Sequence, residues 1–508
     1  MEISKQAVAS DTETHDVAEP SRRSFLRGSS LMAGAVVSGA TLATFAAHSA
    51  RASGNHHEKN HDHGWDNDFD GWRSEYGEVR PVPDQNGNHI LALPKGFQYV
   101  TFSAIGDCMN DGNIVPRAHD GMTCFEWRGS VVRLIRNHEV RTGPGAFQDP
   151  STFSMGGPAR TRYDALGVGG TVTLDFDLKR KKVLREFVSL NGTIVNCSGG
   201  LAWRNGGWIT SEESVAGPAQ GWGQKHGYNF LVPVMAQSAV PAVPIKWMGR
   251  FAHEASVADA RGYLYETEDA GNTSGFYRAI PHRPDSLLRG GKLEMLAIKG
   301  SPQSDLTTSQ TVGARLPVEW VSIEDADPDL ENGALSCFRQ GFDKGGAFFN
   351  RLEGVFIGLD GRSVYFVSTS GGDSRYGQLW HYIPADGKLN KTDQLVLVFE
   401  SPNGSVLDSP DNICITPRGG ILFCEDDASG DGDGHPLAPG FSDVNRLIGM
   451  GGLGEPFEFA VNLLNESEFA GACFSPDGST LFVNLFGGSS AGSGMTCAIW
   501  GPWARGPL

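Results

Sequence analysis

The sequence predicts an all-β fold, a six-bladed β-propeller-like domain with long loop insertions. Three observations lead to this prediction: six hairpins of one design recur along the chain, long runs with helical spacing are sparse, and connections of irregular length separate the hairpins. Each hairpin has a polar start, an apolar strand, a turn containing glycine, a β-branched or aromatic strand and a polar finish.

The six hairpins follow one another from the first quarter of the chain almost to its end. In order, they occupy residues 119–139, 196–213, 249–269, 351–373, 410–427 and 468–484. Their turns are read at Arg128-Gly129, at RNGG (204–207), at ADARG (258–262), at Asp360-Gly361, at Arg418-Gly419-Gly420 and at Pro476-Asp477-Gly478. Placing these hairpins around one axis would bring all of their polar ends together.

The third hairpin, GRFAHEASVADARGYLYETED, shows why the ends matter. In an antiparallel hairpin the start of the first strand lies beside the end of the second. Glu254, Glu268 and Asp269 should therefore emerge at one edge of the sheet. For a single hairpin, polar ends are also explained by strands that stop where solvent begins.

Acids recur at these ends in the other hairpins, and this recurrence predicts a metal site. The candidate carboxylate ligands are Glu139, Glu213, Glu254, Glu268, Asp269, Glu353, Glu425 and Asp426. Two carboxylates about 5 Å apart repel by roughly 3 kcal/mol at an effective dielectric constant near 20. Such acids cannot crowd one channel mouth unless cations lie between them or several are protonated.

Charge and composition limit the class of protein. The formal net charge of −17 argues against a nucleic-acid surface and leaves many carboxylates for hard cations such as calcium. The eight cysteines are widely scattered, and we assign no disulfide from the sequence. Only Cys414 and Cys424 are expected to be near neighbours, facing each other across the predicted hairpin at 410–427.

The start of the chain predicts export. Residues 21–27 read SRRSFLR, a twin-arginine pattern, and a weakly apolar stretch and a small-x-small site at Ala50-Arg51-Ala52 follow. We therefore expect a twin-arginine signal peptide over 1–52, a polar His-rich linker and N-terminal extension over 53–88, and a single β-propeller catalytic domain over 89–508. The apolar stretch is too diluted for a permanent membrane span.

The ordered set of motifs resembles the PhoX family of twin-arginine-exported alkaline phosphatases. It comprises HDGM, RNHE, NCSGG, TSEE, GRFAHEA, RLEGV, SPDN and EFAGACFSPDG, and the likeness runs from about Tyr76 to Phe486. The resemblance implies a six-bladed propeller-type fold, an iron pair with calcium ions at its centre (Fe and Ca), and hydrolysis of phosphate esters.

Carried over motif by motif, the resemblance assigns site residues. It implies that Cys197 bridges the irons, that Glu213, Glu254 and Glu353 are ligands, and that Arg351 binds phosphate. Cys197, Glu254, Arg351 and Glu353 are thus the expected catalytic residues, and Asn137 joins Arg351 in substrate binding. A thiolate is a suitable ligand for iron, and the planar fork of arginine matches two phosphate oxygens.

The chain departs from the family pattern at three places. It reads LAWRNGGW at 201–208 where members read TPWGTW, Ser211 replaces a cysteine, and Leu352 replaces a proline. The expected ligand types remain, and the three changes bear on the substrate range and the rate.

These observations predict a monomeric, metal-dependent phosphomonoesterase, periplasmic or secreted. Its expected partners are a small phosphate ester and the twin-arginine export machinery, with no nucleic acid and no stable membrane insertion. Two alternatives stay open: a calcium-dependent propeller phosphodiesterase or lactonase, and a non-catalytic calcium-binding propeller scaffold. Cys197 distinguishes the phosphatase from the scaffold, because a calcium site does not require a soft thiolate ligand.

Overall fold

The structure is a computed structural model that describes residues 76–508 except 388–390, 427–433 and 453. All described residues belong to one compact unit, Thr44–Leu508. The predicted signal peptide at 1–52 and most of the predicted linker lie outside the described residues. Among the described residues, no helix has the length and apolar character to cross a membrane.

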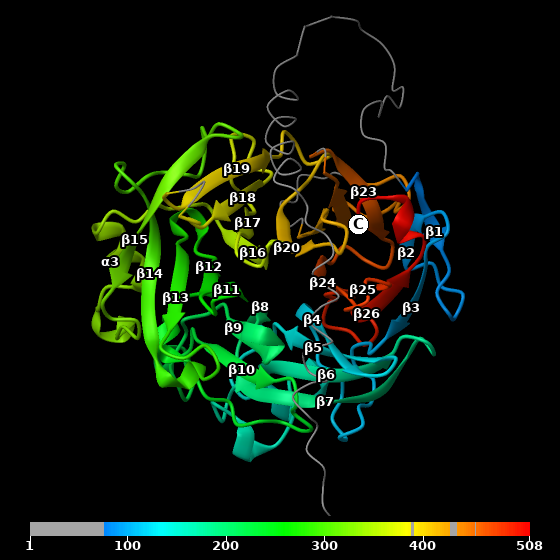
Figure 1. The fold of residues 1–508 in the computed structure, drawn as a ribbon. Coiled ribbons are helices and arrows are strands. Elements are labelled where there is room, and N and C mark those ends of the chain that lie inside the picture. Colours follow the sequence, from blue (N-terminus) through cyan, green and yellow to red (C-terminus); the bar gives the residue numbers. More distant parts are fainter. Residues whose placement is uncertain (1–75, 388–390, 427–433, 453) are drawn as a thin grey trace, which may run out of the picture. The chain divides into compact units, whose positions relative to one another are not determined.

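The strands of the described residues form five hydrogen-bonded sheets (Figure 1). One contains β4 (His119–Arg128), β5 (Val131–His138), β6 (Gly169–Asp177) and β7 (Lys182–Thr193). The next contains β8 (Asn196–Leu201), β9 (Gly207–Glu212) and β10 (Asn229–Pro233). The largest has, in spatial order, β11 (His253–Ala258), β12 (Leu264–Glu268), β13 (Phe276–Pro281), β14 (Gly291–Ile298), β15 (Arg315–Ile323), β19 (Gln394–Glu400), β18 (Gln378–Ile383), β17 (Val364–Ser368) and β16 (Leu352–Ile357).

Two further sheets contain both early and late parts of the chain. One orders β1 (Val79–Val82), β2 (Leu91–Pro94), β23 (Pro456–Asn462), β22 (Arg446–Met450), β21 (Ile421–Glu425) and β20 (Pro410–Ile415). The other orders β24 (Phe469–Phe474), β25 (Thr480–Leu485), β26 (Met495–Trp500) and β3 (Gln98–Phe102).

Helices are short and lie in the connections. The α-helix α3 spans Cys337–Asp343, with Ser336 as its N-cap. The 3-10 turns are Ala146–Gln148, Pro150–Thr152, Ala159–Thr161, Trp203–Asn205, Pro218–Gln220, Lys246–Met248, Gly271–Thr273, Leu287–Arg289, Leu330–Asn332 and Trp503–Arg505.

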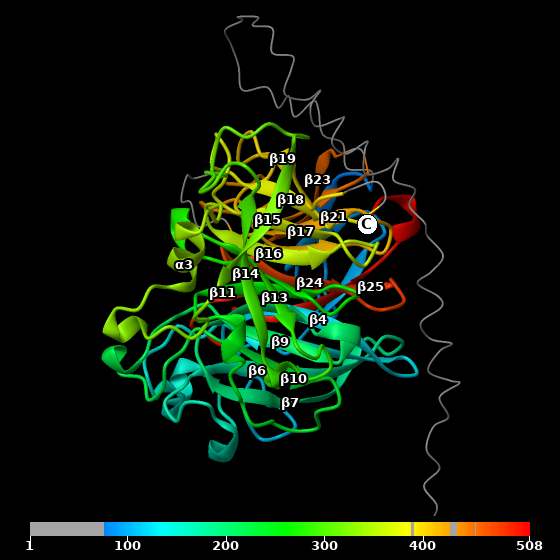
Figure 2. The ribbon, with the colours of Figure 1, turned by 60° about the vertical axis from the view of Figure 1, so that its left-hand side comes forward.

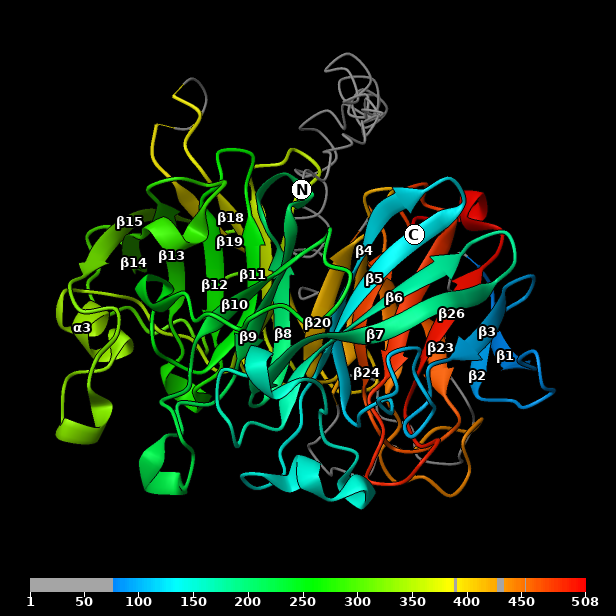
Figure 3. The same ribbon diagram turned by 90° about the horizontal axis from the view of Figure 1, so that it is seen from below.

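The all-β, propeller-like prediction is confirmed, and each of the six predicted hairpins forms. They are β4–β5, β8–β9, β11–β12, β16–β17, β20–β21 and β24–β25. Their first strands contact one another in a closed cycle, β4 to β8, β11, β16, β20, β24 and back to β4. These strands lie nearest the centre in Figure 1, and Figure 3 shows them from below.

Six separate blades are not observed in the part of the chain that the structure describes. β15 pairs with β19 at Arg315–Val396, Leu316–Leu395 and Pro317–Gln394. It thereby links the group β11–β14 to the group β16–β19, so the described strands make five sheets. Figure 2 shows β15 beside β14 and β19 at this junction. The register of β20–β21 also differs from expectation, because Cys414 lies opposite Leu422 and not Cys424.

Residues of the predicted extension at 53–88 take part in a sheet. β1 (Val79–Val82) forms the edge strand and pairs with β2. β3 pairs with β26 near the other end of the chain. Strands from the start of the domain therefore complete two sheets that are otherwise formed by strands from its end.

The six inner strands approach one another closely around the axis. A Cβ atom on Gly200 of β8 would lie 1.4 Å from the carbonyl oxygen of Ser256 on β11, so no larger residue fits there. Apolar side chains fill the space between adjacent sheets, as where Leu134 and Val172 share a buried cluster with Phe482 and Ala498. This packing fixes the inner strand ends that carry the polar residues.

Candidate metal centre

A β-bulge occurs at an equivalent place in all six inner hairpins. The register slips between His119 and Met122, Asn196 and Gly199, His253 and Ser256, Leu352 and Val355, Pro410 and Ile413, and Ala470 and Cys473. Each bulge places two residues opposite one on the partner strand. The first of these two residues is, in chain order, Asp120, Cys197, Glu254, Glu353, Asp411 and Gly471. A bulge bends its strand and re-aims a side chain. Five of the six bulges therefore present an acid or a thiol.

A second set of polar side chains follows the second strand of the hairpins. The backbone nitrogens of Glu139, Glu213, Asp269 and Asp426 donate to carbonyl oxygens just before the first strands, over 2.9 to 3.2 Å. Thr369 holds this position in the β16–β17 hairpin, where its nitrogen donates to Arg351. The bulge residues form one layer of functional groups. Glu139, Glu213, Asp269, Thr369 and Asp426 form another, named here the second layer.

The backbone is strained where the chain enters several of these hairpins. Ala118, Val195, Arg351 and Ser409 each lie two residues before a bulge side chain and have φ values of 58°, 45°, 46° and 41°. Left-handed conformations cost of order 1–3 kcal/mol for residues other than glycine and cluster at functional sites. The repetition of this conformation indicates that it is needed to aim the following side chains.

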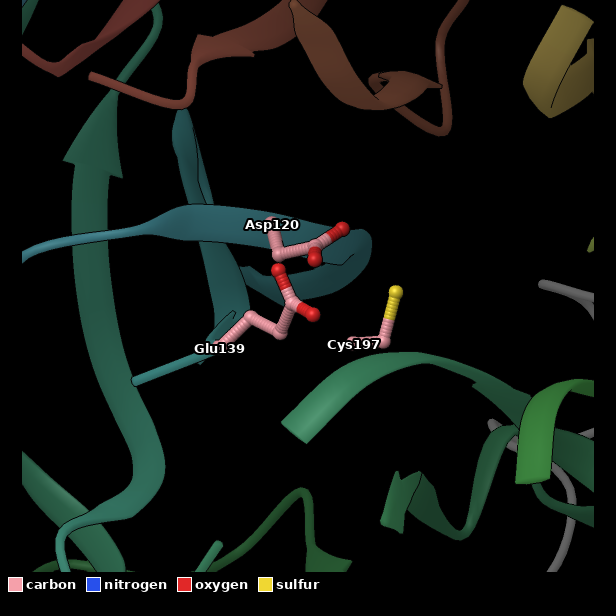
Figure 4. Close-up of side chains that lie close together, drawn as sticks. All are labelled: Asp120, Glu139 and Cys197. Carbon is pink, nitrogen blue, oxygen red and sulfur yellow. The ribbon is translucent and has the colours of Figure 1, made fainter. Parts of the chain in front are cut away.

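Seven of these side chains gather into three overlapping groups. Asp120, Glu139 and Cys197 form one group; Cys197, Glu213 and Glu254 form another; Glu254, Glu353 and Asp411 form the third. Within each group one ligand atom from every residue lies within 4.8 Å of the others. Figure 4 shows the Asp120 and Glu139 carboxylates and the Cys197 sulfur turned toward one shared space. Cys197 and Glu254 connect the three groups into one cluster, named here the axial cluster.

The axial cluster is electrostatically unfavourable by itself. At 4.8 Å two carboxylates repel by about 3.5 kcal/mol at an effective dielectric constant near 20. Burial, and then nearby carboxylates, raises the pKa values of Asp120, Glu139, Glu254, Glu353 and Asp411 well above their ordinary range. Burial likewise raises the pKa of Glu213 to about 7, although Arg141 opposes the shift. The Cys197 thiol has a raised pKa for the same reasons, burial first and then Asp120.

Glu254 gives the most direct indication that cations fit here. It is fully buried, and neither of its carboxylate oxygens has a nitrogen or oxygen donor among the described residues. One oxygen of Asp120 is also buried without a partner among them. Buried carboxylates are normally paired or bound to metals. The donor set of acids and one thiol therefore fits cations.

Two arginines border the axial cluster. Arg141, with a side chain 59% exposed, contacts Glu139 and Glu213. Arg351, with a side chain 34% exposed, places Nη2 2.6 Å from Glu353 and 3.1 Å from Asp269. Both guanidinium groups thus combine contact with the cluster and access to solvent, as a phosphate-binding group requires.

Six predicted site residues are not among the seven members of the axial cluster. Arg351 borders it, Asp269 and Asp426 hold second-layer positions, and Glu268, Glu425 and Asn137 bind protein groups instead. Glu268 accepts hydrogen bonds from Tyr277 and Gly275, and Glu425 binds Arg446 and the backbone of Asp408. Each directly precedes a residue of the second layer, and adjacent strand residues point to opposite faces.

Asn137 is fully buried and donates to the carbonyls of Cys197 and Ser198 while accepting from Trp208. Both amide N–H groups are therefore used, and none is left to donate to a phosphate oxygen of a substrate.

Sequence reasoning missed Asp120, Asp411, Glu468 and Arg141. Burial raises the pKa of Glu468, and the nearby Asp426 and Asp120 add to the shift. An alignment of the hairpin starts would have found Asp120 and Asp411, because HDG, HEA, LEG and PDN place an acid at one equivalent position. Arg141 lies beyond its hairpin, so its approach depends on the fold.

Fold and site together define a class of protein: a propeller-like β domain with a buried cluster of carboxylates and one thiol at its axis, a donor set that could hold cations. The family model described as alkaline phosphatase PhoX matches residues 74–487. The chain therefore belongs to the PhoX alkaline phosphatase family and is a phosphoric ester hydrolase. A search of curated proteins gives no match.

One solved structure supports the fold. PhoX of Pseudomonas fluorescens, in complex with vanadate as a transition-state analogue, is 17% identical with a TM-score of 0.59, covering 85% of this chain and 99% of that one. A luciferin-regenerating enzyme is 10% identical with a TM-score of 0.41, over 80% and 96% of the two chains. A gluconolactonase of Xanthomonas campestris is 11% identical with a TM-score of 0.36, over 84% and 98%. The last two likenesses are too weak to support a function.

Proposed function

We propose that this chain hydrolyses phosphate monoesters at metal ions held by the axial cluster. The observation that carries the proposal is Glu254, a buried carboxylate that joins two groups and has no nitrogen or oxygen donor among the described residues. A buried carboxylate with no donor beside it other than the Cys197 thiol is unfavourable by several kcal/mol, and bound cations remove that cost together with the repulsion around it.

The donor types suggest which metals bind where. The two groups that contain Cys197 offer one thiolate with carboxylates, a set suited to iron, and Cys197 is shared between them. The group of Glu254, Glu353 and Asp411 offers oxygen alone, which suits calcium. We therefore propose iron and calcium as cofactors, with Asp269 and Asp426 supplying further carboxylate charge around the ions.

The residues of this chain would bind and orient the ester. Arg351 is held between Asp269 and Glu353 and can direct its guanidinium fork at two phosphoryl oxygens. We add Arg141 as a second cationic group beside Glu139 and Glu213. Metal ions, when bound, would polarise the phosphoryl group and lower the pKa of water. In this proposal no serine or histidine nucleophile is needed.

A phosphatase assay with matched variants tests the proposal. Purified protein with calcium is incubated with p-nitrophenyl phosphate, and wild type is compared with Cys197→Ala and Glu254→Gln. Both changes should abolish most turnover, whereas Glu268→Gln, a buried acid outside the axial cluster, should retain it because an amide oxygen can still accept from Tyr277. Equal activity in all four proteins would defeat the site assignment.

Metal analysis and substrate choice separate the remaining alternatives. Iron together with calcium in native protein agrees with the phosphatase proposal, and calcium alone agrees with a scaffold. A lactonase would hydrolyse a lactone and ignore p-nitrophenyl phosphate, and a diesterase would prefer bis-p-nitrophenyl phosphate.

We also propose export by the twin-arginine route through a signal peptide at 1–52, which leaves a periplasmic or secreted monomer. Replacing Arg22 and Arg23 by lysine should keep the protein in the cytoplasm, and normal export of that variant would contradict this route.

A further inference from the structure

We propose that Thr267, Asn484 and Asn137 are positioning residues that fix the bulges of neighbouring hairpins and thereby aim the side chains of the axial cluster. Thr267 Oγ1 donates to the carbonyl of Glu353 over 2.5 Å, and Asn484 Nδ2 donates to the carbonyl of Asp120 over 2.6 Å. Asn137 Nδ2 donates to the carbonyl of Cys197 over 3.0 Å. The proposal rests on the proposed role of the axial cluster as a metal site.

The three donors occupy the same position in three hairpins. Asn137 and Thr267 lie two residues before Glu139 and Asp269, whose nitrogens donate to carbonyls before the first strand. Asn484 lies two residues before Phe486, whose nitrogen makes the same kind of bond. In every case the acceptor carbonyl belongs to the first bulge residue of the adjacent inner strand.

The need for these bonds follows from the bulges. A bulge leaves its extra residue outside the strand ladder, so backbone groups there lack a regular partner. A buried carbonyl without a donor is unfavourable. Without that hydrogen bond, the peptide unit of the bulge residue can rotate, and the ligand side chain then rotates with it. A polar side chain from the next hairpin satisfies the carbonyl and fixes the direction of the ligand.

The donors are themselves held in one orientation. All three are fully buried. Asn137 Oδ1 accepts from Trp208 Nε1 over 2.8 Å, and Asn484 Oδ1 accepts from Thr496 over 2.7 Å. These contacts leave each amide NH₂ group to face the neighbouring carbonyl.

Thr267 connects two cluster residues. Its Oγ1 accepts from the nitrogen of Ala255, which follows Glu254 within the same bulge, over 3.0 Å. One hydroxyl therefore ties the bulge of Glu254 to that of Glu353, two members of the group proposed for calcium.

Thr267→Val is the sharpest test, because it removes the hydroxyl and keeps the shape. The metal-loaded protein is mixed with excess EGTA, and calcium release is followed with metal analysis; turnover of p-nitrophenyl phosphate is measured separately. We expect release to be roughly 10- to 100-fold faster, the range seen when groups supporting metal ligands are removed. Thr267→Ser should restore the wild-type rate.

Thr173→Val is the matched control. Thr173 is a buried strand residue whose hydroxyl has no hydrogen-bond partner among the described residues, so its loss should leave calcium release unchanged. If Thr267→Val does not fold, Asn484→Ala tests the same proposal at Asp120. We expect this variant to lose iron faster than wild type.

Calcium release from Thr267→Val at the rate of Thr173→Val would overturn the proposal. So would lower stability of Thr267→Val with unchanged release, because the hydroxyl would then be merely structural. Wild-type iron retention in Asn484→Ala would count against the proposal in the same way. A wild-type protein without phosphatase activity would defeat the proposed function but leave the metal-release comparison valid.

Discussion

Replacing Glu213 by glutamine should change stability in opposite directions with and without metals. Burial raises the pKa of Glu213 from 4.5 to about 7 in the metal-free fold. A carboxyl with a raised folded-state pKa favours folding at low pH, and this contribution disappears as the pH rises through 7. This rise in pKa corresponds to roughly 3 kcal/mol, at 1.36 kcal/mol for each pKa unit.

Glutamine stays neutral, so it avoids this cost at high pH. In EGTA at pH 8, Glu213→Gln should have a free energy of unfolding about 3 kcal/mol higher than wild type, and most of the gain should vanish below pH 5. With iron and calcium present the order should reverse, because the variant lacks one ligand of the group that contains Cys197 and Glu254.

Urea unfolding followed by tryptophan fluorescence, at pH 4.5 and pH 8 with and without metals, measures all four values. Glu268→Gln is the control: its pKa is also raised to about 7 by burial, but it lies outside the axial cluster. Its gain should therefore be the same in both metal states. A metal-free Glu213→Gln protein less stable than wild type at pH 8 would refute the electrostatic reasoning, and an unchanged order with metals would refute the role of Glu213 as a ligand.

Two further substitutions test the phosphate-binding group and the sixth bulge. Arg351→Lys should lower kcat/KM for p-nitrophenyl phosphate by roughly 10- to 100-fold, because an ammonium group cannot reproduce the bidentate fork; an unchanged value in steady-state kinetics would contradict this role. Gly471→Ala should destabilise the protein by at least about 1–3 kcal/mol in thermal unfolding, because φ is 62° and a Cβ would lie 2.5 Å from the carbonyl of Asp120. Gly112→Ala, with φ of 83° and no atom near the added Cβ, isolates the backbone cost from the clash, and equal losses in the two variants would argue against close packing at Gly471.

The hairpins were predictable because their signals are local. Turns such as Asp360-Gly361 and alternating strands such as the one ending at Glu268 depend on nearby residues alone. The number of sheets was not predictable in this way. It depends on pairing of β15 with β19, whose partners Arg315 and Val396 are separated by a long stretch of chain. Local sequence patterns carry no information on such a contact.

The sequence by itself determined that acids and one cysteine stand at the ends of repeated hairpins, and its motifs indicated the family. It could not determine which of two adjacent acids faces the axis. Asp269 and Asp426 hold the second-layer position while Glu268 and Glu425 bind groups elsewhere, because successive residues of a strand point to opposite sides.

Only the tertiary structure decided which side chains meet. A bulge in each inner strand turns one residue toward the common axis, and packing of six strands brings Asp120, Cys197, Glu254, Glu353 and Asp411 together. Bulges and their partners on neighbouring hairpins depend on backbone groups that are far apart in the chain. The physical reason is that a cluster of like charges has no local signature: it exists only where the fold compels distant carboxylates to share one buried space.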